Sequence, residues 1–319
     1  MPPKFIFTNV IGSFVFNENY NPVDAVLFKD FEQFKDKKEF EGKLQKKHAN
    51  LEIPEGRDLY NILSYFKDKK FFSEFYKKNL SFTKKSLKES VNNDSLIIQT
   101  ISSIEELDKV QNILTKRLRE WYSLYNPEAS NKIKDHEKFV SLIISKSKSK
   151  LLKELNVDEK ESIGADLKEE DLSSIMLLAT QINNNYRLRS HYESYLSKIE
   201  KKHCLNLAII AGVTMAAKLI EHAGSLRRLA EMPASTLQIL GAEKALFRHI
   251  RNKRRNLPPK YGMLHEHQLI QKSHRKMHGK VARALADKLS MAVRIDYFKG
   301  KFIGDKLKKE LVDKFKIQY

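Results

Sequence analysis

The chain has 319 residues, of which 41% are hydrophobic, and this is enough for two or three domains that each bury a core. Its net charge is +19, and residues 204–319 hold most of it, with 24 Lys and Arg against nine Asp and Glu, which points to a nucleic acid or an anionic membrane surface as partner. No membrane partner is expected, because the longest apolar run, residues 205–217, is too short to span a membrane, and no signal peptide is apparent. The single cysteine, Cys204, excludes an intramolecular disulfide and favours a reducing compartment.

Residues 1–93 predict a small α/β domain. Alternating hydrophobic residues between positions 4 and 28, on either side of an Asn-rich turn, predict a β-hairpin. The stretch from residue 30 to about 90 is rich in Lys, Phe and Leu and predicts charged helices. Its aromatic residues could form a docking surface, but packing in a core is the more frequent outcome for such side chains. They include Phe71, Phe72, Phe75 and Tyr76.

Residues 94–203 predict an antiparallel coiled-coil hairpin. Apolar residues recur at steps of three and four from Ile97 to Trp121, and a second helix is expected after Gly164, where Asp166 and Glu169 have the spacing of a capping box. We expect this hairpin to act as a spacer and to join two copies of the chain. The alternative is an ordinary helical bundle whose seam is buried within one chain. The seam residues of the second helix are Ile175, Leu178, Ile182, Asn185, Arg189, Tyr192 and Leu196.

Residues 204–319 predict a compact, all-helical domain with two basic helices. The first is expected in QILGAEKALFRHIRNKRR, residues 238–255, with Ala242, Leu246 and Ile250 facing a core. The second is expected to start near Ser273, with basic residues on one face and apolar residues on the other. The cations at helical spacing are Lys244, Arg248, Arg251 and Arg255 in the first helix and Lys276, Lys280 and Arg283 in the second.

The start of the first basic helix, at Gly241, is a predicted contact for a phosphate. The first backbone N–H groups of a helix have no partners within the helix, and the helix dipole is positive there. Glu243 could accept a hydrogen bond from a base amino group. A carboxylate at this position also complements the helix dipole, and spacing alone favours that simpler role.

Catalytic and metal-binding chemistry finds little support in the sequence. No glycine-rich nucleotide-binding loop follows a strand, and no carboxylate pair in the basic region suggests acid–base catalysis. The histidines His265, His267, His274 and His278 have no cysteine nearby and only one carboxylate, Glu266, so no metal site is expected and contacts with RNA explain them as well. We therefore expect a binding protein without a catalytic residue or a cofactor of its own.

Several long segments carry a resemblance to a known family. The string MPASTLQILGAEKALFRH, followed by PPKYG and GKVARALADKLSMAVRIDYFKGKFIGDKL, closely resembles the Nop domain of the box C/D ribonucleoprotein core proteins. Upstream, LIIQTISSIEELDKVQNILTKRLREWYSLYNPE resembles the coiled coil of that family, so the likeness covers residues 95–319. The length, and an end without a Lys/Glu-rich tail, are similar to the archaeal Nop56/Nop58-like members. The resemblance implies a mainly α fold, α+β overall, with a small α/β N-terminal domain, an antiparallel coiled-coil hairpin and an all-helical C-terminal Nop domain.

The function that this resemblance implies is that of a scaffold. The N-terminal domain would hold the methyltransferase fibrillarin, which carries S-adenosylmethionine, and the coiled coil would join two copies. The Nop domain would clamp a box C/D guide RNA already bent by a ribosomal-type kink-turn-binding protein, in a particle that 2′-O-methylates target RNA. The expected location is cytoplasmic for an archaeal-type member and nucleolar in a eukaryote. The alternatives are a splicing-type Nop-domain protein on another kink-turn RNA and, in a different class, a stand-alone RNA-modifying enzyme.

The resemblance also implies where RNA and its bound protein would contact the chain, and it favours the base contact of Glu243. The segment after the motif, RNKRRNL, is more basic than is usual in the family, so we expect extra phosphate contacts there. The contact residues that the motif implies are Gly241, Ala242, Glu243 and Lys244, with Gln238 before them and Arg248 after them. We add Arg251, Arg255, Lys280 and Arg283 to this set.

Overall fold

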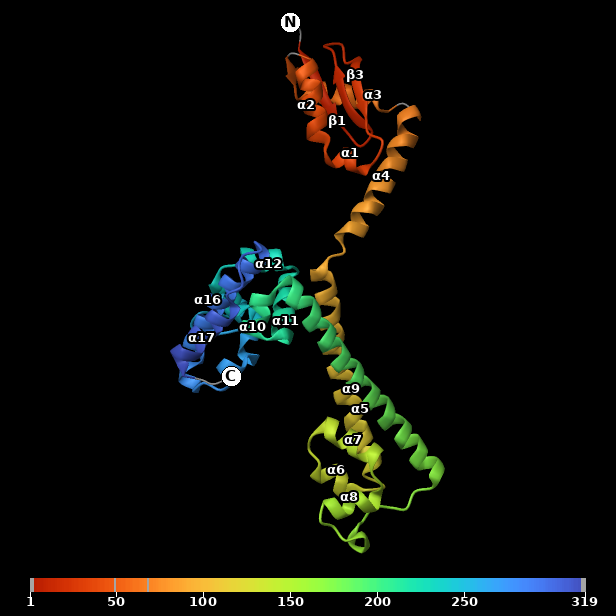
Figure 1. Cartoon of the computed structure of the whole chain (residues 1–319), viewed down its shortest axis with the longest axis vertical. Coiled ribbons are helices and arrows are strands. Elements are labelled where there is room, and N and C mark those ends of the chain that lie inside the picture. The colour runs from red at the N-terminus through yellow and green to blue at the C-terminus, as the bar shows by residue number, and fades with distance from the viewer. Residues whose placement is uncertain (1–2, 49, 68, 317–319) are drawn as a thin grey trace. The chain divides into compact units, whose positions relative to one another are not determined.

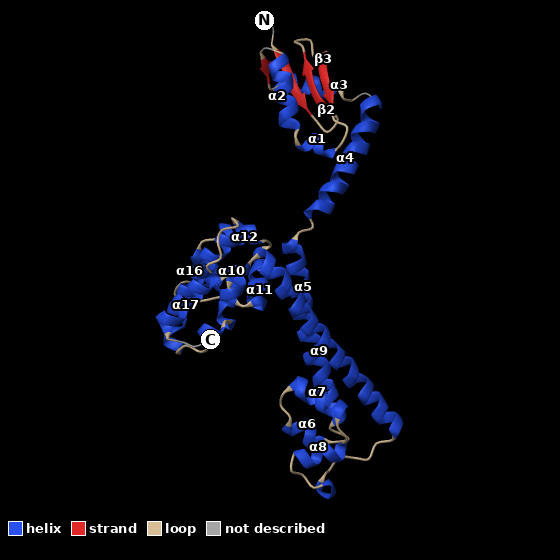
Figure 2. Ribbon diagram, viewed as in Figure 1, coloured by secondary structure: helices blue, strands red, loops and turns tan. Residues whose placement is uncertain are grey.

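The computed structural model describes residues 3–48, 50–67 and 69–316, which form two compact units that divide between Asn92 and Asn93 (Figure 1). The first unit contains the β-sheet, and the second is built from helices (Figure 2). The predicted fold class, mainly α with a small α/β part at the N-terminus, is therefore confirmed. Each unit has its own core.

The first unit is built on a four-stranded sheet with the order β3-β2-β1-β4. The predicted hairpin is present: β1 and β2 pair antiparallel, with Phe5 opposite Phe16. The fourth strand runs parallel to β1, which requires the crossover that the first two helices supply. The strands are β1 (Lys4–Thr8), β2 (Gly12–Phe16), β3 (Pro22–Leu27) and β4 (Leu51–Glu52).

Both faces of the central strand β2 are covered, and for this reason all five of its residues are buried. Phe14 and Phe16 pack with Ile62 on one face, and Val15 packs with Leu44 on the other. Ile62 belongs to α3 and Leu44 to α2, so these two helices lie on opposite sides of the sheet. The helices of this unit are α1 (Phe31–Lys35), α2 (Lys37–Lys47), α3 (Gly56–Tyr65) and α4 (Lys69–Ser90).

The aromatic residues of α4 do not all pack in the core, as the sequence favoured. Phe71 contacts the core cluster around Phe14 and Phe16. Phe72 and Tyr76 are 69% and 60% exposed, and Phe75 is also exposed. The expectation of core packing is therefore wrong for these three side chains, which the core of this unit does not cover.

The second unit starts with two long paired helices, α5 (Asn93–Tyr122) and α9 (Glu169–His203), which form the predicted antiparallel hairpin (Figure 1). The expected capping box is wrong, since α9 begins at Glu169 with Lys168 as N-cap and without a side-chain cap. The connection between the two helices is folded rather than a simple linker. It consists of α6 (Pro127–Lys132), α7 (His136–Ser145), α8 (Lys148–Glu154) and the 3-10 helix η1 (Glu159–Glu161).

The seam of α9 is largely covered by other parts of the same chain. Ile175 and Ile182 are fully buried in a cluster with residues of α5 and α7, and Leu196 is fully buried in the core of the C-terminal helices. Arg189 forms ion pairs with Asp108 of α5 at 2.5 Å and with Glu193 at 2.9 Å. These contacts agree with the alternative of a seam buried within one chain. Leu178, Asn185 and Tyr192 are partly buried, and the surface that joins two copies stays a prediction.

The C-terminal helices surround α16, whose apolar face is buried as the sequence predicted, at Val281, Leu285, Leu289 and Ala292. Three residues of α5 lie in the same core, so residues 94–203 and 204–319 form one compact unit rather than two. The helices are α10 (Leu205–Ala211), α11 (Val213–Ala223), α12 (Leu226–Glu231), α13 (Ala234–Ile239), α14 (Glu243–Arg251), α15 (Gln268–Gln271), α16 (His278–Tyr297) and α17 (Gly304–Phe315), with 3-10 helices η2 (Met263–Glu266) and η3 (Arg275–Met277).

No single helix in the described part of the chain is long and apolar enough to cross a membrane. The helices α10 and α11 have the required length and composition only when they are taken together. They are bent by 116° at the break between them, which Gly212 occupies with a φ of +81°.

Candidate nucleic-acid interface

The start of α14 is fixed by contacts to Glu243. Gly241 has a φ of +84°, in the left-handed region that favours glycine, and Ala242 is the N-cap. Glu243 Oε1 accepts a hydrogen bond from the Gly241 N–H at 2.7 Å, and Nε2 of His222 lies 3.1 Å from the same oxygen. The predicted free N–H at Gly241 is therefore wrong, because the carboxylate of the next turn occupies it.

The same contacts set the charge state of Glu243. Partial burial raises the pKa of its carboxyl, but hydrogen bonds from the Gly241 and Glu243 backbone and from His222 outweigh this and lower the pKa. The side chain is thus held as an anion over the positive end of the helix dipole. This geometry matches the simpler of the two roles considered for Glu243, and its base contact stays a prediction.

Three of the four predicted cations lie on α14. Lys244, Arg248 and Arg251 are all exposed, and each follows the one before it by about one turn of the helix. Arg255 does not belong to this face, because α14 ends at Arg251 and Arg255 lies in the following turn, where its N–H donates to Asn252 Oδ1. The cationic spacing continues through this end and so does not indicate it.

The loop after α14 is tied back to the helix by side-chain amides and a histidine. Asn256 Nδ2 donates to the carbonyl of Arg248 at 3.1 Å, and the carbonyl of Asn256 lies 2.6 Å from His249 Nδ1. Free carbonyls at the C-terminus of a helix need such partners. The basic residues 253–255 are consequently held close to the last turn of α14 rather than extending its cationic face.

The apolar residues of α14 do not face a core. None of the residues Glu243–Arg251, all of which the structure describes, is buried, and the predicted core contact of Ile250 is wrong because this side chain is 56% exposed. Phe247, which sequence analysis did not select, is 66% exposed. A surface hollow of about 800 Å³ is lined by Lys244, Phe247, Arg248, Ile250 and Arg251.

Phe247 could have been identified from the sequence by its spacing. It follows Lys244 by three residues and precedes Arg251 by four, so it shares the cationic face of the helix. Soluble proteins seldom leave a large apolar side chain exposed within a cluster unless another molecule covers it. The face of α14 therefore combines exposed cations with apolar groups that suit a protein or a nucleic acid base.

The remaining predicted residues lie in a second group. Gln238 of α13 and Lys280 and Arg283 of α16 line one groove. Gln238 Nε2 donates to the Lys260 carbonyl at 2.6 Å, and its own carbonyl accepts from the Gly262 N–H. Lys276 is not on the face of α16 as expected, because that helix begins at His278 and Lys276 lies in η3.

The histidine-rich segment is divided between the surface and the core. The rings of Tyr261 and His265 stack with centroids 4.8 Å apart, and His278 lies 5.9 Å from Tyr261. His267 is buried, with Nε2 3.0 Å from the Ile210 carbonyl, and its burial lowers the pKa of the imidazole. Across the described residues, no group of three or more His, Cys, Asp and Glu side chains is arranged to hold a metal ion.

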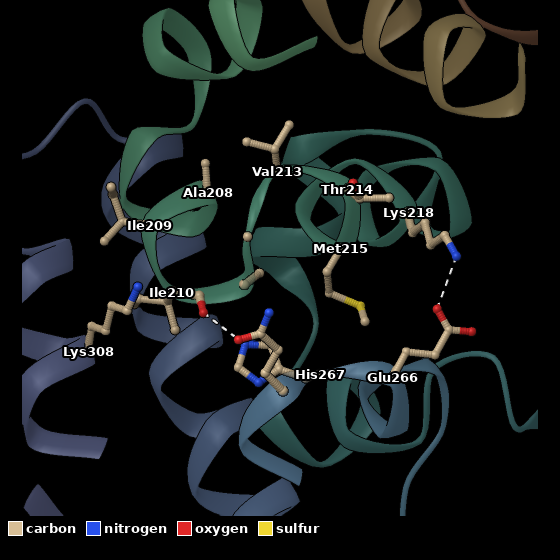
Figure 3. Close-up of a pocket in the computed structure, with 13 residues that line it drawn as sticks. Ala208, Ile209, Ile210, Val213, Thr214, Met215, Lys218, Glu266, His267 and Lys308 are labelled. Carbon is tan, nitrogen blue, oxygen red and sulfur yellow. Dashed lines mark hydrogen bonds and ion pairs between the residues drawn. The ribbon is translucent and has the colours of Figure 1, made fainter. Parts of the chain in front are cut away.

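A separate pocket of about 600 Å³ lies next to His267, at the break between α10 and α11 (Figure 3). Lys218 donates to Glu266 at 3.0 Å at its rim, and this lysine also pairs with Glu105 of α5. None of the predicted RNA-contact residues lines this pocket. It therefore plays no part in the candidate interface.

A protein-family profile described as "Nop: snoRNA binding domain, fibrillarin" matches residues 103–317, which include α14 and the groove. The chain belongs to the Nop family. An uncharacterized NOP5 family protein of Methanocaldococcus jannaschii is 41% identical over 271 residues, which cover 79% of this chain and 63% of that protein. Nucleolar protein 56 of Schizosaccharomyces pombe is 39% identical over 68% of this chain and 48% of the relative, and nucleolar protein 58 of the same organism is 35% identical over 64% and 42%.

The Nop chain thus spans less than two thirds of the length of these relatives. A solved structure of a fibrillarin/Nop5p complex contains a chain that aligns with the present chain over 98% of each, at 20% sequence identity and a TM-score of 0.45. The family match begins within α5, so it does not include the N-terminal unit.

Proposed function

We propose that this chain is the scaffold of a box C/D guide-RNA ribonucleoprotein, in which it bridges fibrillarin to a guide RNA bound by the kink-turn protein and so directs 2′-O-methylation. The observation that carries the proposal is the face of α14, where exposed Phe247 and Ile250 lie among Lys244, Arg248 and Arg251 within the Nop match. The family description names snoRNA and fibrillarin, and relatives are named nucleolar proteins 56 and 58.

The mixed character of this face favours a composite partner over naked RNA. Cations directed at phosphates give affinity that falls steeply with salt and does not depend on sequence. They leave Phe247 and Ile250 in water, since a phosphate backbone offers these side chains nothing to pack against. An RNA that carries a bound protein covers both kinds of group at once, and the interface then gains apolar burial as well as charge neutralisation.

The N-terminal unit supplies a different kind of surface for fibrillarin. On α4, the exposed side chains of Phe72, Tyr76, Leu80 and Leu87 lie within a narrow sector of the helix. An apolar strip of this kind suits a folded protein partner. S-adenosylmethionine would be bound by fibrillarin, and this chain would contribute no catalytic residue.

Two copies of the chain would be joined through the hairpin of α5 and α9, on surfaces other than the buried positions Ile175, Ile182 and Leu196. The particle would be nucleolar in a eukaryote, in keeping with the names of the nucleolar relatives, and cytoplasmic in an archaeon.

Reconstituted methyl transfer tests this function. Fibrillarin, the kink-turn protein, guide RNA, target RNA and S-adenosylmethionine are combined with and without this chain. We expect methylation of the target only in the complete mixture. Methyl transfer by this chain without fibrillarin would support a stand-alone enzyme and contradict the scaffold. RNA recovered with the chain from cells should carry box C and box D elements, whereas enrichment of a spliceosomal kink-turn RNA would place the chain with the splicing-type relatives.

A further inference from the structure

A groove with a strong excess of positive charge lies between α13, α16 and α17. Its volume is about 540 Å³, which is in the range of sites for small ligands. Lys280 and Arg283 line it from α16, one turn apart, and Lys314 lines it from α17. The remaining lining residues are Ala234, Ser235, Gln238, Ala284, Asp287 and Phe315.

The cations of this groove are not neutralised by the protein. Within the described chain, Lys280, Arg283 and Lys314 form no ion pair, and Asp287 is the one acidic residue among the described residues that line the groove. Nearby, Lys288 is neutralised by Glu310 at 2.5 Å across the same two helices. Three cations with one carboxylate leave an excess of positive charge around this concave site, so an anion that enters the groove reduces the repulsion between the cations.

The groove also offers an aromatic ring. Phe315 is half-buried, and Lys314 Nζ lies 5.8 Å from the centre of its ring. A ligand that fits both features carries negative charge and a flat ring, as a nucleotide does. Stacking of a base on an aromatic side chain combined with cations along the backbone is the usual way in which proteins hold single-stranded nucleic acid.

A short stretch of chain joins the groove to α14. Gln238 lines the groove, and the chain runs from it through Gly241 directly into α14. The amide of Gln238 is bonded to the Lys260 carbonyl, so the loop that follows α14 is fixed to the rim of the groove.

We propose that this groove binds an unpaired nucleotide of the RNA that α14 contacts, with its flanking phosphates on Lys280, Arg283 and Lys314 and its base against Phe315. The inference rests on the proposed RNA-binding function and adds to it a second, single-strand subsite. The kink-turn and its protein are recognised at α14, and the strand that extends from the kink-turn is held in the groove.

The test compares two RNAs that both carry the kink-turn protein: a minimal kink-turn and the same kink-turn extended by single strands at either end. Affinity for the full chain is measured over a range of salt concentrations. For the extended RNA, Arg283→Ala and Lys314→Ala should each reduce the slope of log K against log salt by about 0.7, the value for one phosphate contact on a single strand. Phe315→Leu, which keeps an apolar group against the core, should lower affinity about tenfold without changing the slope.

The minimal RNA and a neighbouring lysine provide the controls. None of these variants should change binding of the minimal kink-turn. Lys309→Ala removes an exposed cation from α17 outside the groove and should leave both RNAs unaffected. Equal losses for the two RNAs, unchanged binding of the extended RNA, or an effect of Lys309→Ala as large as that of Lys314→Ala would each overturn the proposal.

The same assay tests other occupants of the groove and separates failure of this inference from failure of the proposed function. If free mononucleotide or inorganic phosphate competes as well as the single strand does, the groove is a small-molecule site. If an acidic peptide competes equally well, the groove is a protein site. Either result overturns the inference. If the wild-type chain binds neither RNA, the proposed function fails. If it binds both and the groove variants bind the extended RNA normally, the function stands and the groove inference alone is lost.

Discussion

The carboxylate of Glu243 accepts a hydrogen bond from the backbone N–H of Gly241, across 2.7 Å, and so closes the start of α14 with a charge from its own first turn. Because this N–H is occupied, we assign the proposed RNA contact at α14 to side chains of the helix. Gly241 and Glu243 thus set where the helix begins, and Lys244, Arg248 and Arg251 are the side chains to which we assign the proposed phosphate contacts.

Glu243→Gln should weaken the start of α14 in a pH-dependent manner. The folded-state pKa of Glu243 lies below its ordinary value of 4.5, so its contribution is present above that pH and is lost as the pH falls through the lowered pKa. At pH 7 we expect a loss of less than about 1 kcal/mol in the free energy of unfolding, since the side chain is partly exposed. Urea unfolding from pH 7 to pH 3 checks this: the gap between variant and wild type should narrow below pH 4.5, and a constant gap would contradict it.

Gly241→Ala should destabilise the same turn without changing any charge. The φ of +84° disfavours an L side chain, and an added Cβ would meet Met263 at 3.4 Å. We expect a loss of about 1–2 kcal/mol in the free energy of unfolding and weaker RNA binding at every salt concentration. Gly42→Ala is the matched control, because it lies in α2 with open space around its Cβ and should be neutral or stabilising. Equal effects of the two substitutions would count against the role assigned to Gly241.

Phe247→Ser should separate the two kinds of contact on α14. The side chain is exposed, so the melting temperature should not fall. Affinity for the kink-turn RNA with its protein should drop, whereas affinity for naked RNA should stay the same, since in the proposed complex the bound protein covers the ring. Fluorescence anisotropy with both RNA states measures this difference. A parallel loss for naked RNA would instead place Phe247 against a base.

Glu200→Leu should stabilise the chain. Both carboxylate oxygens of Glu200 are buried without a hydrogen-bond partner among the described residues, and burial raises its pKa to about 9. The wild type therefore loses stability as the pH rises from about 4.5, where the unfolded carboxyl ionises, toward 9, and the Leu variant should not. We expect a gain of about 1–3 kcal/mol at pH 7 by differential scanning calorimetry. Glu200→Gln should also remove the pH dependence and should keep the gain in stability at pH 7. A Leu variant that is less stable than the wild type would contradict the assignment of Glu200 as a buried, unpaired carboxyl.

The elements that periodicity defines could be predicted from the sequence. The hairpin of β1 and β2, the paired helices α5 and α9, and the buried face of α16 follow from repeats of two and of about 3.6 residues. Glu200 could have been noticed too, because it follows the buried Leu196 by four residues and so falls on the same face of α9.

The features that depend on tertiary contacts could not be predicted. The spacing of cations from Lys244 continues to Arg255, but Asn252 and Asn256 end the helix at Arg251 through hydrogen bonds that only the folded loop makes. The exposure of Ile250 could not be inferred, because a helical repeat of apolar residues does not say whether a core is present. Lys314 and Phe315 lie more than thirty residues from Lys280, and only the packing of α16 and α17 brings them into one groove.

The most direct test of the central claim is the binding of the double variant Lys244→Ala, Arg248→Ala to guide RNA that carries the kink-turn protein. Both side chains are exposed, so the fold and fibrillarin binding should be unchanged. We expect association to be lost at physiological salt, and at low salt we expect the slope of log K against log salt to be smaller by the contribution of about two phosphate contacts. Wild-type affinity and slope in the double variant would show that the face of α14 is not the RNA-binding surface.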